Sequence, residues 1–169
     1  NQGQICLCGS RILIEKSIYE KFKAEFIDRV KKLNVGDPMD DTSKQGAVVS
    51  KVHFEKILHC IALAKQEGGN ILLGGNAVKL EGRCENGYFI EPTIIEGLGA
   101  HCQTNMEEIF GPVVTLQPFE TEAEALALAN ACDYGLASTL WTQDISKANR
   151  VAININAGIV WINCWLLRD

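Results

Sequence analysis

The sequence predicts an α/β fold in which a mainly parallel sheet is covered by helices on both faces. Short apolar runs alternate along the chain with longer segments whose apolar residues recur every three or four positions. Strands and helices that alternate in this way are typical of crossover connections between parallel strands. No linker or internal repeat divides the sequence, and its 169 residues are enough for one domain with a sizeable core.

The N-terminal part supplies one strand and two helices. The apolar run at 10–15 predicts a strand, and the periodicity that follows predicts a helix from about 17 to 32. A second helix is predicted from about 50 to 66, because apolar residues share one face until two glycines, Gly68 and Gly69, end it.

The middle of the chain is predicted to be strand-rich. Residues 70–73 form an apolar run typical of a buried strand. Two further strand segments, 88–90 and 93–95, are separated by Pro92, which cannot donate to a ladder. Proline is found mainly on edge strands, so we expect these two segments near a sheet edge.

The C-terminal part completes the alternation. A strand is predicted at 113–119, and a capping box then opens a helix over 121–130. A strand at 136–141 follows, and Asp144 caps one more helix before the last strand at 159–162.

Charge and cysteine usage narrow the classes of function. The chain carries 16 Lys and Arg against 21 Asp and Glu residues, a net charge of −5, with no basic run. We therefore expect neither nucleic acid nor an anionic membrane surface as a partner. The seven cysteines form neither an even-numbered disulfide framework nor a zinc spacing. We predict no metal site, reduced thiols and a cytoplasmic location.

The N-terminal run Asn-Gln-Gly-Gln-Ile-Cys-Leu-Cys carries the chemistry of greatest interest. Its small and amide residues lead Cys6 into a turn, where free backbone N–H groups stabilise a thiolate, the form that attacks carbonyl carbon. The common alternative is an unreactive cysteine that fills apolar space. Cys8 is a rival thiol, and the other five cysteines are predicted to be buried fillers.

Five segments in order along the chain resemble the active-site and core motifs of the NAD(P)-dependent aldehyde dehydrogenase superfamily. The first is the Asn-x-Gly-Gln-x-Cys pattern followed by Ser-Arg, and the others are Val35–Pro38, Glu107–Val113, Tyr134–Ala137 and Gly158–Asn163. The resemblance implies a Rossmann-like catalytic domain and selects Cys6 over Cys8 as nucleophile. It also implies oxidation of an aldehyde to an acid through a thiohemiacetal and a thioester on Cys6.

The resemblance implies roles for two residues of the Glu-Glu-Ile-Phe-Gly-Pro segment. Glu108 would accept the hydroxyls of the coenzyme ribose, and Phe110 would line the nicotinamide pocket. Without the family, two solvated acids on a surface turn would be the simpler interpretation. The coenzyme implied is NAD, with NADP left open.

The segment after the last strand borders the substrate entrance in this family. Trp165 and Arg168 would suit an aldehyde that carries a carboxylate, because a guanidinium pairs with a carboxylate in a two-pronged fork. The pattern here is most similar to the 2-aminomuconate and 2-hydroxymuconate semialdehyde dehydrogenases. A solvated surface charge is the alternative for Arg168.

The family's general base, oxyanion asparagine and phosphate-binding sheet all precede the nucleophile. We therefore predict that residues 1–169 are one catalytic-domain segment that lacks the N-terminal cofactor-binding domain and the C-terminal oligomerisation segment. The parent enzyme is expected to be a homo-oligomer, and the segment alone is expected to be inactive.

Two other functions use the same residues. A Cys-dependent acyl hydrolase or transferase would need a histidine base beside Cys6, and only His53, His59 and His101 are available. A non-catalytic module that retains the fold would have a buried, unreactive Cys6.

Overall fold

The computed structural model describes residues 2–167. Its strands are β1 (Arg11–Glu15), β2 (Asn70–Leu73), β3 (Ala77–Val78), β4 (Phe89–Ile90), β5 (Thr93–Glu96), β6 (Val113–Phe119), β7 (Ala137–Leu140) and β8 (Ile159–Ile162). Its α-helices are α1 (Tyr19–Val30), α2 (Lys51–Gln66), α3 (Gln103–Met106), α4 (Glu122–Ala129) and α5 (Ile145–Asn154).

A four-stranded sheet in the order β1-β6-β5-β2 forms the centre of the molecule. The β1–β6 and β5–β6 pairs are parallel, and β2 joins antiparallel to β5. Strands β7 and β8 form a separate parallel pair, and β3 and β4 a short antiparallel one. The predicted mainly parallel α/β architecture is confirmed.

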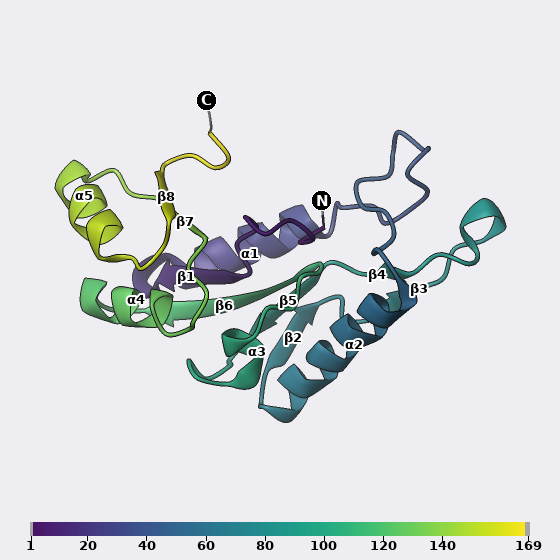
Figure 1. Cartoon of the computed structure of the whole chain (residues 1–169), viewed down its shortest axis with the longest axis horizontal. Coiled ribbons are helices and arrows are strands. Elements are labelled where there is room, and N and C mark those ends of the chain that lie inside the picture. The colour runs from purple at the N-terminus through teal and green to yellow at the C-terminus, as the bar shows by residue number, and fades with distance from the viewer. Residues whose placement is uncertain (1, 168–169) are drawn as a thin grey trace.

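Helices α1 and α2 cover opposite faces of the four-stranded sheet (Figure 1). On one face, Phe22 and Phe26 of α1 pack with Ile14, Ile94 and Leu116. The residues of α2 on the other face share full or nearly full burial and meet apolar residues of β4, β5 and β6; they are Ile57, Cys60, Ile61 and Ala64. The adjacent residues Ile94 and Ile95 of β5 thus pack into different cores, since successive side chains of a strand point to opposite faces.

β5, predicted near a sheet edge, lies next to the edge strand and is not itself the edge. β5 lies between β6 and β2, and it is β2 that forms the edge of this sheet. Pro92 precedes the strand, and the first ladder donor is Thr93, whose N–H lies 2.8 Å from the Pro112 carbonyl. The missing N–H of Pro92 therefore removes no hydrogen bond from the β5 ladder. As an edge strand, β2 is only partly buried, whereas the sequence predicted burial.

The helix starts follow the predicted capping chemistry. The side chain of Thr121 accepts a hydrogen bond from the Glu124 N–H, and the Asp144 carboxylate accepts from Ser146 and Lys147. Ser50 caps α2 in the same way, through the His53 N–H. Helix α1 is shorter than the predicted 17–32: a 3₁₀ turn at Lys16–Ile18 precedes it, and it ends at Val30.

The β7–β8 pair and α5 lie together beside the end of the sheet that carries β1, with α4 near them (Figure 1). Arg150 of α5 holds Glu122 of α4 through two hydrogen bonds of 2.7 and 2.8 Å. Arg11 of β1 donates to the carbonyls of Leu128 and Ala129 at the end of α4. Between residues 2 and 167 no helix is long and apolar enough to cross a membrane.

Candidate active site

The N-terminal loop places Cys6 at an exposed turn. The Cys8 N–H donates to the Ile5 carbonyl at 2.9 Å, so Cys6 and Leu7 are the central residues of a tight turn. The loop is anchored by Gln2, whose side-chain amide donates to the Ala47 carbonyl at 2.9 Å. The Cys6 thiol is therefore presented toward solvent by a fixed backbone.

The Glu107–Val113 segment follows the short helix α3 and is held by α2. The Lys56 ammonium donates to the Glu108 carbonyl at 2.6 Å, and the His53 Nε2 lies 2.6 Å from the Phe110 carbonyl oxygen. Phe110 has a φ of 60°, a left-handed conformation that is uncommon for an aromatic residue. Because the flanking Ile109 and Gly111 are buried, the loop has little freedom to relax from this conformation.

The two segments meet at a pair of glycines. Gly3 has a φ of 76°, and a Cβ atom added there would lie 1.9 Å from the Gly111 carbonyl oxygen. A Cβ on Gly111 would in turn lie 2.5 Å from Ile57 Cδ1 of α2. Only glycine permits this approach, so the sequence allows the N-terminal loop, the Phe110 loop and α2 to stack directly.

A cavity of about 280 Å³ lies where the two segments meet. Its lining includes Gly3, Ile5 and Cys8 of the N-terminal loop and Glu108, Phe110 and Gly111 of the second segment. Cys6 is exposed at the adjoining turn and is not part of this lining. The fold thus brings Glu108 and Phe110 to the Cys6 loop, although about one hundred residues separate them in sequence.

Trp165 also reaches the Cys6 loop. Its indole N–H donates to the Leu7 carbonyl at 3.3 Å, while 44% of the residue stays exposed. The segment is tied down further along by Trp161, whose indole N–H donates to the Leu167 carbonyl at 2.9 Å. Arg168, the second predicted substrate residue, lies outside the described residues.

The prediction of five buried fillers is wrong for four of these cysteines. Cys60 is buried in the core on α2, and burial raises the pKa of its thiol. The partly exposed ones are Cys84, at the end of a short 3₁₀ helix, and three in turns and loops: Cys102, Cys132 and Cys164.

The histidines do not form a nucleophile–base pair with Cys6. His53 contacts Phe110 in two ways: its ring nitrogen lies beside the Phe110 carbonyl oxygen, and the two rings meet edge to face with their centroids 6.3 Å apart. His59 and His101 are exposed, and no hydrogen bond within residues 2–167 joins Cys6 to an imidazole. In the same part of the chain no group of three or more His, Cys, Asp or Glu side chains could hold a metal ion.

Sequence reasoning missed the support that α2 gives to the site. His53, Lys56 and Ile57 all contact the Glu108–Gly111 backbone. Their spacing of three and four positions places them on one helix face, which a helical pattern could have indicated. The sequence contains no signal for which loop that face would hold.

The fold and this pair of segments define a class of protein, and comparison with known proteins identifies it. The model of the aldehyde dehydrogenase family matches residues 1–169. The chain belongs to this family, which confirms the resemblance and the fold that it implies.

Individual relatives match the chain along its whole length. An acetaldehyde dehydrogenase of Pseudomonas aeruginosa is 46% identical over 167 residues, which cover 99% of this chain and 33% of that protein. A 2-aminomuconic semialdehyde dehydrogenase of Mus musculus is 42% identical and covers 100% of this chain and 35% of its own length. The crystal structure of betaine aldehyde dehydrogenase from Staphylococcus aureus, in complex with NAD+, matches with a TM-score of 0.91, 44% identity, and coverage of 99% and 33%. The chain therefore spans about a third of the length of these relatives.

Proposed function

We propose that the chain is the nucleophile-bearing segment of an NAD(P)-dependent aldehyde dehydrogenase and that Cys6 is its nucleophile. The observation that supports this most strongly is the approach of Gly3 to the Gly111 carbonyl, which brings together the two segments that matter for the chemistry. One carries an exposed thiol at a turn, and the other carries a carboxylate and an aromatic ring.

The reaction follows from the nucleophile. The Cys6 thiolate attacks the aldehyde carbon, and the carbonyl oxygen becomes an oxyanion that backbone N–H groups near the turn can stabilise. A nicotinamide coenzyme held by Glu108 and Phe110 would supply the acceptor for the hydride that leaves this carbon. The carbon–oxygen double bond forms again, which leaves a thioester on Cys6. Water then attacks the thioester, releases the carboxylic acid and returns the thiol.

The donor set fits a nicotinamide coenzyme. Glu108 is exposed at the cavity and can accept two ribose hydroxyls, and the Phe110 ring offers an apolar wall to a planar group. The relative from S. aureus was crystallised with NAD+. These observations support NAD as the coenzyme.

The substrate proposed is an aldehyde that bears a carboxylate. The 2-aminomuconic semialdehyde dehydrogenases are among the relatives, and Trp165 contacts the Cys6 loop through Leu7. Trp165 would form an apolar wall, and Arg168 would pair with the distal carboxylate. The acetaldehyde dehydrogenase among the relatives offers the contrasting case of a small neutral substrate.

The remaining parts of the proposal concern the whole protein. Residues 1–169 would be part of the catalytic domain of a longer, homo-oligomeric cytoplasmic enzyme. The general base, the oxyanion asparagine and most of the coenzyme site would come from outside these residues. The match over about a third of each relative supports this division.

The test compares the full-length protein with its Cys6→Ala and Cys8→Ala variants. We expect NADH to form with NAD and a semialdehyde, to be lost in Cys6→Ala, and to persist in Cys8→Ala. NADH formation is followed by absorbance, first with a carboxylate-bearing semialdehyde and then with a neutral aldehyde of similar size. Equal rates in the unmodified and Cys6→Ala proteins would end the proposal, as would ester hydrolysis by Cys6 without any coenzyme-dependent oxidation.

A further inference from the structure

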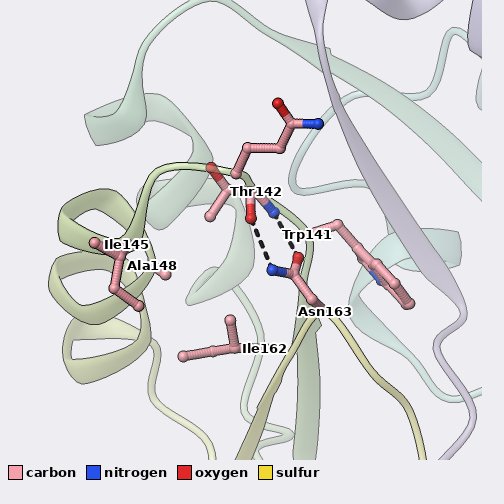
Figure 2. Close-up of a pocket in the computed structure, with 7 residues that line it drawn as sticks. Trp141, Thr142, Ile145, Ala148, Ile162 and Asn163 are labelled. Atoms are coloured by element: carbon pink, nitrogen blue, oxygen red, sulfur yellow. Dashed lines mark hydrogen bonds between the residues drawn. The ribbon is translucent and has the colours of Figure 1, made fainter.

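The residue that follows β8, Asn163, is bound to the end of β7 by three hydrogen bonds. Its backbone N–H donates to the Leu140 carbonyl at 2.8 Å. Its side-chain oxygen accepts from the Thr142 N–H at 2.9 Å, and its side-chain nitrogen donates to the Thr142 carbonyl at 2.8 Å. Figure 2 shows the side-chain pair as two parallel dashed lines, with the amide occupying the place of another peptide group of the ladder.

This side chain stabilises an uncommon backbone conformation. Asn163 has a φ of 55°, in the left-handed region that asparagine enters more readily than most residues. In that conformation the chain turns out of the direction of β8. A side chain that fixes both the donor and the acceptor of Thr142 leaves the turn a single geometry.

The turn determines where the next residues go. Two positions after Asn163, the Trp165 indole donates to the Leu7 carbonyl, immediately beside Cys6. The other end of the segment is held by the bond between Trp161 and the Leu167 carbonyl. The path from Thr142 through Asn163 to Trp165 therefore ends on the nucleophile turn.

We propose that Asn163 is a positioning residue that sets the Trp165 wall against the Cys6 turn and thereby the fit of the aldehyde. This inference rests on the proposed function, because it assigns Trp165 to the substrate side of that site. Asn163 touches neither substrate nor coenzyme in this role, and it acts through the segment that follows it.

The experiment uses the full-length protein with three changes at this position. Asn163→Ala removes both side-chain bonds, Asn163→Gly removes them but accepts the left-handed φ without strain, and Asn163→Asp keeps the acceptor and loses the donor. The matched control is Asn149→Ala, which removes an exposed asparagine of α5 whose side chain donates to the Ile145 carbonyl and not to Thr142.

The expected result is a rise in the aldehyde KM of roughly tenfold in Asn163→Ala and Asn163→Gly, because both lose the two side-chain bonds that hold the turn. The KM for NAD should not change, and Asn149→Ala should match the unmodified protein. Normal aldehyde KM in Asn163→Gly would overturn the inference, because backbone strain alone would then explain Asn163→Ala. An equal rise in the KM for the aldehyde and the KM for NAD would overturn it too.

A second measurement does not depend on catalysis. In protein labelled with 5-fluorotryptophan, the fluorine resonance of Trp165 is assigned from a Trp165→Phe variant. We expect this resonance to shift in each Asn163 variant and to stay in place in Asn149→Ala. An unmoved resonance refutes the positioning role, whereas failure of the unmodified protein to form NADH refutes only the proposed function.

Discussion

Gly3 has no space for a side chain, and this residue joins the two halves of the candidate site. A Cβ atom here would lie 1.9 Å from the Gly111 carbonyl oxygen, which excludes other residues, and the φ of 76° disfavours them further. The sequence identified the thiol of Cys6 and the acid–aromatic pair by resemblance. It could not show that two glycines far apart in the chain bring them together, because that contact depends on how the sheet folds.

We predict that Gly3→Ala destabilises the protein by about 1–2 kcal/mol through the left-handed φ alone, with a further loss from displacement of the Phe110 loop. Aldehyde oxidation should fall roughly a hundredfold, since the thiol and the coenzyme segment move apart. Denaturant unfolding and the NADH assay measure the two effects.

Gly9→Ala is the matched control for this change. Gly9 lies in the same loop, but a Cβ there would meet nothing within 4 Å, so stability and activity should be nearly unchanged. Equal effects at the two glycines would contradict the steric argument.

At the scale of elements, helix α1 is fastened to the sheet by a small polar cluster. The Glu96 carboxylate at the end of β5 accepts hydrogen bonds from Lys23 at 3.0 Å and from the Tyr19 hydroxyl at 2.9 Å. Burial alone would raise the pKa of Glu96, but the bonds from Lys23 and Tyr19 outweigh it and lower that pKa. Burial and the bond to Glu96 raise the pKa of Tyr19.

The lowered pKa of Glu96 makes this cluster a source of pH-dependent stability. The folded protein binds the proton less readily than the unfolded chain, so the stabilisation is complete above the ordinary value of 4.5 and is lost as the pH falls below it. We predict that Glu96→Gln lowers the free energy of unfolding at pH 7 by roughly 1–2 kcal/mol and flattens its decline below that value. Unfolding curves from pH 7 down to about 3 measure both.

The matched control for Glu96→Gln is Glu20→Gln. Glu20 contacts the same Lys23 at 3.0 Å, but its side chain is 79% exposed, and surface pairs of this kind contribute little. A Glu20→Gln loss as large as that of Glu96→Gln would show that charge on α1, and not the link to the sheet, supplies the stability.

Element boundaries were predicted best where local chemistry decides them. The caps at Thr121 and Asp144 are made by side chains next to the helix, so the sequence identified both. That β2 and not β5 forms the edge could not be predicted, because Pro92 indicates only a local donor that is missing. Which strand ends at the edge depends on pairing between distant segments.

At the scale of the whole molecule, the chain matches about a third of each relative. We predict that residues 1–169 alone form no NADH from an aldehyde, because the proposed function places the general base and the oxyanion asparagine outside these residues. The NADH assay on the folded segment, checked by circular dichroism, measures this, with the full-length protein as the positive control. Aldehyde-dependent NADH from the segment alone would contradict the division.

The family and the fold class could both be predicted from the sequence, because ordered motifs and alternating periodicity extend along the entire chain. The role of α2 could not, since His53 and Lys56 act on backbone carbonyls that no motif marks. Side-chain bonds to a loop carbonyl depend on the final packing and not on the identity of the loop residue.

Helix α2 also fixes the position of both loops of the candidate site. Ile57 packs where Gly111 passes, and Gly111 in turn faces Gly3, so α2, the Phe110 loop and the N-terminal loop form one stack. A tilt of this helix would shift sulfur and carboxylate together and preserve their mutual spacing. Substitutions on the exposed face of α2 should therefore move the two loops as a unit, with little change in the distance between Cys6 and Glu108.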